Sequence, residues 1–279
     1  MPAQPPFPRI ISPAPDLHEV PRSTWHEVTE RRRVTRRLRH ALAAGDLLLH
    51  YQPLVTLGSG QIRGAEALVR LRHHRLGLLP ASHFMPGVER ADIIVEFGGW
   101  LLDQACAQAA IWPEPACIAV TLAPRHLQDR NFMRQFLERL GRTGIAPERL
   151  ELGLTEAMLT GATTNTAFSL NALQGLGVRL ALTIFGGGSI NLPALRRLQL
   201  TTLRLDRSLT HNLDGNPDSD AIVRAIKTGH ELGCTVLADG VDTKRQFSRL
   251  LKMGCDEGQG NYFSPPLAAS ELVAWFTPR

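Results

Sequence analysis

The sequence predicts an α/β fold, a TIM-like (β/α)8 barrel whose first strand is antiparallel to its neighbours. Eight short apolar runs alternate with segments of helical periodicity, which is the pattern of such a barrel. The length of 279 residues is close to the roughly 250 residues of single-domain barrels. A doubly wound open sheet is the alternative, but no GxGxxG pattern follows the first predicted strand, as a dinucleotide-binding sheet would require.

The predicted elements follow one another along most of the chain. The apolar runs expected to form strands are 47–55, 62–71, 117–123, 150–156, 179–185, 201–206, 234–241 and 257–263. The segments expected to form helices are 93–112, 131–144, 221–233 and 243–254. The last three helical segments end at a glycine, the residue that most often caps a helix in the left-handed conformation.

The first two strands are joined by a turn that is too short to contain a helix. A short turn containing GSGQ (58–61) is all that separates the runs 47–55 and 62–71. Parallel strands need a crossover of about a dozen residues, whereas a short glycine-containing turn makes an antiparallel hairpin. The barrel is therefore expected to begin with an antiparallel strand.

The segment before the barrel differs in composition. Residues 1–30 place six prolines in their first fifteen positions, which predicts a flexible segment, and the barrel domain is expected to cover 31–279. RRRVTRRLRH (31–40) supplies much of the formal net charge of +5. It is either a basic arm for nucleic acid or an anionic membrane, or the solvated face of an amphipathic helix. The second interpretation is favoured, because no aromatic residues interleave to stack on bases.

The sequence contains no targeting or membrane-spanning signal. No stretch approaches the roughly 18 apolar residues that cross a bilayer, and the N-terminus lacks the basic and apolar regions of a secretory signal. Four scattered cysteines form no CxxC pair and are predicted to be reduced, buried thiols: Cys106, Cys117, Cys234 and Cys255. We expect a cytoplasmic protein without a membrane span and without a nucleic-acid partner.

Functional side chains of a (β/α)8 barrel lie at the carboxyl ends of its strands. Here those ends supply a thin polar rim: Glu66, Thr121, Gly153, Glu156, Thr183, Arg204, Asp206, Asp239, Asp242 and Gln259. In LALTIFGGGSINL (180–192) a buried strand opens onto three glycines, yet Thr183 and Ile184 stand at the junction instead of acids. No lysine or helix N-cap follows, so the glycines alone predict no phosphate cradle. The adjacent His73 and His74 should diverge, which argues against a metal pair.

These residues resemble the EAL domain family, bacterial phosphodiesterases that hydrolyse cyclic di-GMP. The resemblance runs from about Arg31 to the C-terminus and implies a TIM-like barrel with one antiparallel strand. Seven blocks carry it in the family's order: YQPLV (51–55), GAEALVR (64–70), PASHFMPGVE (80–89), ACAQ (105–108), LDRS (205–208), ADGVDTKRQ (238–246) and QGNYFSPPL (259–267).

The resemblance implies a chemistry for which this chain lacks most of the groups. Family members use two Mg²⁺ or Mn²⁺ ions to activate a water and to neutralise the phosphodiester. The family's residues survive here as Glu66, Glu156, Asp206 and Gln259. Its other positions are substituted: asparagine by Thr121, the metal-binding glutamate by Gly153, two aspartates by Thr183 and Ile184, lysine by Arg204, and the general-base glutamate by Asp239.

Neighbouring carboxylates do not replace the missing ones. Glu151 points the same way as Gly153 but should lie about 6 Å deeper, because a strand rises about 3.3 Å per residue. We therefore expect Mg²⁺ and Mn²⁺ binding to be lost and no catalytic residue to be functional. The protein is predicted to be an inactive relative of the phosphodiesterases, with no metal and no other cofactor.

A non-catalytic domain can still bind the nucleotide. The resemblance implies a cyclic di-GMP site made by Arg70, Glu66, Pro86, Arg204, Asp239, Gln259 and Phe263. Arg70 matches an arginine that contacts a phosphate, and Arg204 keeps a positive charge that suits a phosphate bidentately. The alternatives are that Arg70 pairs with a carboxylate, that Glu66 braces Arg70, and that Phe263 only packs the end of the barrel.

Three functions follow, in order of preference. The first is a metal-independent cyclic di-GMP receptor that acts through protein partners. The second is a nucleotide-free protein-interaction scaffold that regulates transcription or motility, and the third is an active phosphodiesterase. No second signalling domain is recognisable in the sequence, so the first two functions need a protein partner, which the sequence does not identify. The resemblance also allows a homodimer.

Overall fold

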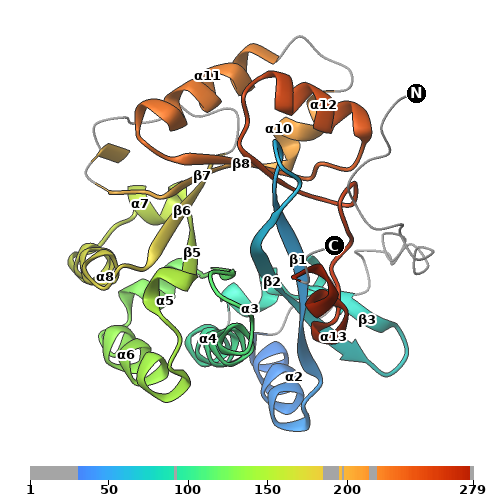
Figure 1. The fold of residues 1–279 in the computed structure, drawn as a ribbon. Helices are drawn as coiled ribbons and strands as arrows, with labels where there is room; N and C mark the ends of the chain where they lie inside the picture. Colours follow the sequence, from blue (N-terminus) through green and yellow to red (C-terminus); the bar gives the residue numbers. More distant parts are fainter. Residues whose placement is uncertain (1–30, 91–92, 185–194, 197, 214–218, 277–279) are drawn as a thin grey trace.

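A computed structural model describes residues 31–90, 93–184, 195–196, 198–213 and 219–276. Eight strands close into a barrel in the order β1-β2-β4-β5-β6-β7-β8-β9, with β9 returning to β1 (Figure 1). The strands are β1 Leu47–Thr56, β2 Ile62–His73, β4 Cys117–Thr121, β5 Leu150–Thr155, β6 Arg179–Ile184, β7 Thr202–Leu205, β8 Thr235–Asp239 and β9 Glu257–Gln259. The predicted TIM-like barrel is confirmed.

The first strand has the predicted direction. β1 runs antiparallel to β2 and to β9, whereas every other pairing around the barrel is parallel. The hairpin argument from GSGQ is therefore confirmed, and the strand ends that carry the polar rim lie at one end of the barrel.

Helices surround the strands (Figure 1). They are α2 Arg31–Ala44, α3 Met85–Arg90, α4 Ile94–Ala110, α5 Pro124–Gln128, α6 Phe132–Thr143, α7 Glu156–Thr160, α8 Thr164–Gly175, α10 Arg207–Asn212, α11 Ser219–Glu231, α12 Lys244–Lys252 and α13 Ala269–Leu272. The amphipathic segment at 31–40 is the helix α2, which buries Leu38 and Ala41 and exposes Arg36 and Arg37. This burial agrees with the solvated helix face favoured from the sequence.

Several elements differ from the sequence prediction. The helices α3, α5, α7, α8, α10 and α13 were not predicted. The last strand stops at Gln259, and the chain turns at Gly260, whose carbonyl accepts from the Phe263 and Ser264 backbone N–H groups. A short strand that the sequence did not signal, β3 Gly77–Pro80, pairs antiparallel with the end of β2. Four residues are too few for a recognisable alternation. Phe185 and the glycines 186–188 lie outside the described residues.

The outward faces of the strands pack against the helices in one large apolar core, while a smaller apolar cluster lies inside the barrel. The inner cluster contains Leu54, Cys117, Ala119 and Leu237. All four cysteines are buried and free, as the sequence predicted. Among the residues that the structure describes, no helix is both long and apolar enough to cross a membrane.

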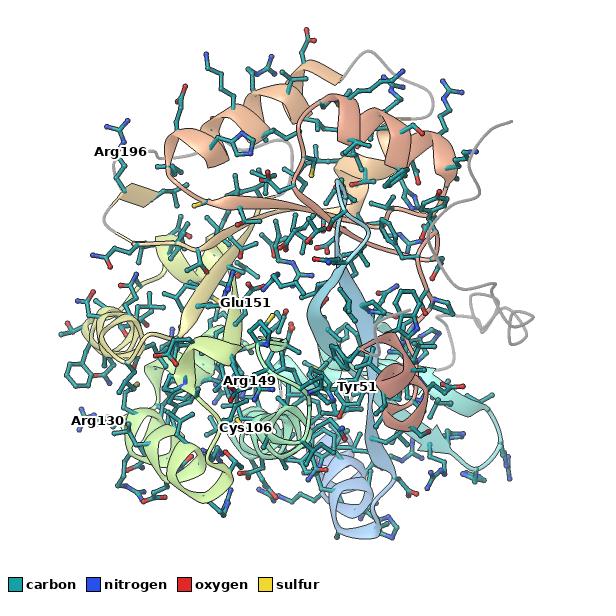
Figure 2. The ribbon with its side chains drawn as sticks, viewed as in Figure 1. Tyr51, Cys106, Arg130, Arg149, Glu151 and Arg196 are labelled. Carbon is teal, nitrogen blue, oxygen red and sulfur yellow. The ribbon has the colours of Figure 1, made fainter. Side chains whose placement is uncertain are left out.

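A charged group that we call the base layer lies inside the barrel toward the start of the parallel strands; it consists of Arg63, Glu151, Arg179, Thr202 and Glu257. Arg63 is the extra residue of a bulge in β2, and bulges commonly redirect a side chain. Its guanidinium donates to Glu151 Oε2 at 3.0 Å and to Glu257 Oε2 at 2.8 Å. Figure 2 shows Glu151 inside the barrel, where it is fully buried. The predicted deeper position of Glu151 is confirmed.

Candidate functional site

Polar side chains converge at the opposite end of the barrel, where the parallel strands finish. Because inward-facing positions alternate along a strand, each of β2, β7, β8 and β9 delivers one such group. We call this set the mouth layer; it consists of Glu66, Arg204, Asp239 and Gln259. All four were selected from the sequence, and the structure brings them into direct contact.

Arg204 lies at the centre of the mouth layer and is only 4% exposed. Its Nη2 donates to Glu66 Oε2 at 2.7 Å, to Asp239 Oδ1 at 2.8 Å and to Gln259 Oε1 at 3.0 Å. Its Nη1 donates to Glu66 Oε1 and its Nε to Asp239 Oδ2, each at 3.2 Å. The guanidinium is therefore bidentate to both carboxylates, the strongest geometry for such pairs.

This arrangement adds intramolecular contacts that the sequence did not predict for Arg204. Arg204 was expected to offer its guanidinium to a phosphate of the ligand. In the structure all three of its side-chain nitrogens donate to protein side chains. The sequence placed a cation at this strand end, and two carboxylates face it there. Its predicted contact with a phosphate stays a prediction.

Hydrogen bonds from two other side chains fix the orientation of Glu66. Thr121 Oγ1 donates to Glu66 Oε1 at 3.2 Å, and Gln259 Nε2 donates to Glu66 Oε2 at 2.9 Å. Gln259 Nε2 also donates to Gln52 Oε1 at 3.1 Å. Sequence reasoning missed Gln52, although it was signalled by being a polar residue in an apolar strand that pairs directly with Glu66 in the hairpin.

The two carboxylates of the mouth layer titrate differently. Burial acts to raise the pKa of Glu66, but the charge of Arg204 and hydrogen bonds from Arg204, Gln259 and Thr121 outweigh it, so the pKa is lowered. Burial raises the pKa of Asp239 to about 6; Arg204 opposes this rise and the neighbouring Glu66 charge adds to it. Two carboxylates share one guanidinium, so the second of them to ionise is disfavoured.

Arg70 is a different kind of cation. It lies four residues beyond Glu66 on β2, is half-buried, and donates from Nη1 to the Val69 carbonyl at 3.1 Å. Burial lowers its pKa. Among the described residues no carboxylate forms an ion pair with Arg70, and Glu66 pairs with Arg204 instead. The alternatives in which Arg70 neutralises a carboxylate, or is braced by Glu66, are therefore not what the structure shows.

The substituted rim positions offer no further acid to the mouth layer. A Cβ at Gly153 would lie 2.7 Å from Thr121 Oγ1, so these two residues fit each other tightly. Thr183 is half-buried on β6, and its neighbour Ile184 is 4% exposed within the main apolar core.

The remaining predicted residues lie apart from this contact network. Asp206 caps α10 by accepting a hydrogen bond from the Ser208 backbone N–H at 2.8 Å. Phe263 is 1% exposed and packs edge-on against Phe247 and Tyr262. Pro86 is exposed on α3.

Two further acids of the predicted rim, Glu156 and Asp242, also lie outside the mouth layer. Glu156 begins α7. Asp242 accepts from Arg207 Nη2 at 2.7 Å and from the Asn261 backbone at 3.0 Å.

Comparison with known proteins identifies the family. The family model named EAL domain matches residues 35–266, and the chain belongs to this family. It is 37% identical to an uncharacterized signaling protein of Caulobacter vibrioides, covering 90% of this chain and 31% of the relative. It is 34% identical to the bifunctional diguanylate cyclase/cyclic di-GMP phosphodiesterase MucR of Pseudomonas aeruginosa, covering 85% and 35%. This chain therefore spans about a third of the length of these curated relatives.

A solved structure supports the same family. The structure described as PaMucR phosphodiesterase in complex with c-di-GMP has a TM-score of 0.81 at 32% identity, and the match covers 86% of this chain and 99% of that chain. The fold and the family are thereby established.

The mouth layer, as placed, does not fit the pair of divalent cations that the family chemistry uses. Mg²⁺ and its relatives need several oxygen ligands at about 2.0–2.6 Å. The oxygens of Glu66, Asp239 and Gln259 already accept from the guanidinium that lies between them. Among the described residues, no group of three or more His, Cys, Asp or Glu side chains is placed to hold a metal ion. The expected divergence of His73 and His74 is wrong, because their ring centroids lie 4.6 Å apart.

Proposed function

We propose that this EAL domain is a non-catalytic, metal-independent receptor for cyclic di-GMP that acts through protein partners. One observation carries the proposal: the Arg204 guanidinium lies between Glu66 and Asp239 and donates hydrogen bonds to both carboxylates. Without a metal, the domain lacks both the activated water and the charge that stabilises phosphodiester hydrolysis.

Arg70 supports the binding part of the proposal. A half-buried guanidinium that donates only to a backbone carbonyl in the described structure retains donors for a ligand. Phosphate is the anion that a guanidinium recognises best, because the two are complementary in geometry and charge. The fold is shared with MucR, whose structure is described as a complex with c-di-GMP. We also propose a cytoplasmic location; a homodimer stays a prediction.

Two assays test the proposal. Purified protein incubated with cyclic di-GMP and Mn²⁺ should leave the nucleotide intact by chromatography. Calorimetry should detect micromolar or tighter binding that EDTA does not change. Arg70→Ala should weaken binding at least tenfold, whereas Arg72→Ala, which removes an exposed arginine from the same strand, should not. Linear pGpG above a no-protein control, lost in Glu66→Ala, would show that the domain is an active phosphodiesterase.

The scaffold function is favoured by a different observation. Two carboxylates face one guanidinium in the mouth layer, and a net negative charge there repels a dianionic nucleotide. The proposed pocket residue Phe263 is also fully buried rather than offered to a base. If no heat is measured at high micromolar protein, the receptor is excluded and the nucleotide-free scaffold is the function to pursue by pulldown from the native host.

A further inference from the structure

The mouth layer is organised around a positive charge that belongs to the chain itself. Arg204 makes five hydrogen bonds to three side chains, from strands β2, β8 and β9. Its burial opposes the charged form, but the neighbouring Asp239 and Glu66 charges raise its pKa well above the usual value. An arginine side chain is charged in proteins under ordinary conditions, and no chelator removes it.

Two of the three acceptors around Arg204, Glu66 and Gln259, have further hydrogen-bond partners, whereas the hydrogen bonds described for the Asp239 side chain come from Arg204. Glu66 is oriented by Thr121 and Gln259, as described above. Gln259 uses its amide nitrogen for Glu66 and Gln52, which turns its amide oxygen toward Arg204. Three oxygen-bearing groups thus point at one position, and this is the donor chemistry that hard divalent cations prefer.

From this geometry we infer that Arg204 is a built-in cation: it occupies and closes a divalent-cation position at the barrel mouth, and its truncation opens that position to Mn²⁺ or Mg²⁺. Glu66, Asp239 and the amide oxygen of Gln259 are the ligands, and water completes the shell. The inference rests on the metal independence in the proposed function, but it makes no use of nucleotide binding.

The test measures Mn²⁺ binding to metal-stripped protein by electron paramagnetic resonance, with no nucleotide present. Arg204→Met keeps the length of the side chain and removes its charge. We expect it to bind one equivalent of Mn²⁺ at least tenfold more tightly than the wild type. Arg72→Met, which makes the same charge change on an exposed residue, should behave like the wild type, and Arg204→Met with Glu66→Gln should lose the gained binding.

Three results would overturn the inference. One is Mn²⁺ binding by the wild type as tight as that by Arg204→Met. Another is a folded Arg204→Met protein with no gain over Arg72→Met. Folding itself is the third readout: an Arg204→Met protein that is unfolded in EDTA should fold when millimolar Mn²⁺ is added, because the ion replaces the guanidinium. If it stays unfolded, the inference fails. Because no nucleotide is used, failure here is distinguishable from failure of the receptor proposal.

Discussion

The barrel holds two charged layers that are built from the same residue types in different proportions. In the base layer, Arg63 and Arg179 face Glu151 and Glu257, so cations and anions balance. In the mouth layer one cation, Arg204, faces two carboxylates. Buried charges are stable only when they are paired and hydrogen-bonded. The balanced layer is therefore a structural element, whereas the unbalanced one keeps a charge that a proton, or a cation, can neutralise.

The layers are also connected through the strands. Arg63 precedes Glu66 by three residues across the bulge, and Glu257 precedes Gln259 by two. Thr202, which donates to Glu151 at 2.9 Å, precedes Arg204 by two. Inward positions recur every second residue, so the base layer fixes the register of the strands that carry the mouth layer.

The largest expected effect comes from breaking the base layer. Arg63→Met leaves Glu151 and Glu257 buried with Arg179 as their remaining cation, whose Nε lies 3.6 Å from Glu151 Oε2. We expect a loss of about 3–5 kcal/mol in the free energy of unfolding, measured with urea. Arg72→Met should change it by less than about 0.5 kcal/mol. A loss below about 1 kcal/mol for Arg63→Met would mean that the base layer is not a structural element.

Breaking the mouth layer should cost less. Arg204→Met also unpairs two carboxylates, but the Asp239 side chain is 20% exposed and can take up a proton. We expect a loss of about 2–3 kcal/mol at pH 8. The loss should shrink toward pH 5, because unpaired buried carboxylates have a higher pKa in the folded state than in the unfolded chain. Equal or larger losses at pH 5 would contradict this account.

The wild type itself should reveal the unbalanced charge. Asp239 has a folded-state pKa raised to about 6 from 3.8, so the folded protein holds the proton more tightly than the unfolded chain. Its contribution to stability is complete below pH 3.8 and is lost as the pH rises through 6. Asp239→Asn should remove about 1–2 kcal/mol of this pH dependence between pH 4 and pH 7. If the free energy of unfolding depends on pH identically in the wild type and Asp239→Asn, Asp239 does not have the raised pKa.

The smallest expected change in stability comes from the contact between Gly153 and Thr121 beside the mouth layer. Gly153→Ala places a Cβ against Thr121 Oγ1 and should cost about 1 kcal/mol through overpacking. Thr121→Ala removes the closest contact, so the double variant should recover part of that loss. A double-mutant cycle measures the coupling, expected at about 0.5–1 kcal/mol. If the stability losses of Gly153→Ala and Thr121→Ala simply add in the double variant, the tight fit between these two residues is not the cause of the loss in Gly153→Ala.

Much of the fold could be predicted from the sequence, because strand and helix periodicities are local. The direction of the first strand followed from the length of one turn, GSGQ (58–61). The four-residue strand β3 was not predicted because it is too short to show a period, and β9 ends early because the chain turns at Gly260. The pairing of β3 with β2 depends on contacts between segments, which a single sequence does not display.

The candidate site could be predicted as a set of residues but not as a network. Their positions at the ends of predicted strands indicated that four residues would be neighbours, and the structure shows that they are: Glu66, Arg204, Asp239 and Gln259. The partners of Arg204 come from three other strands, so its contacts with Glu66, Asp239 and Gln259 could not be derived from the sequence around it. Its predicted phosphate contact stays a prediction. Arg63 was not recognised at all, because its inward direction comes from a bulge.

The central claim is that a guanidinium, and not a metal, holds the mouth together. Crystals of the wild type grown with millimolar Mn²⁺ and measured at the manganese absorption edge test it most directly. We predict no anomalous peak between Glu66 and Asp239, with the Arg204 side chain in hydrogen-bond contact with both. A manganese peak between these carboxylates, with Arg204 displaced, would contradict the claim.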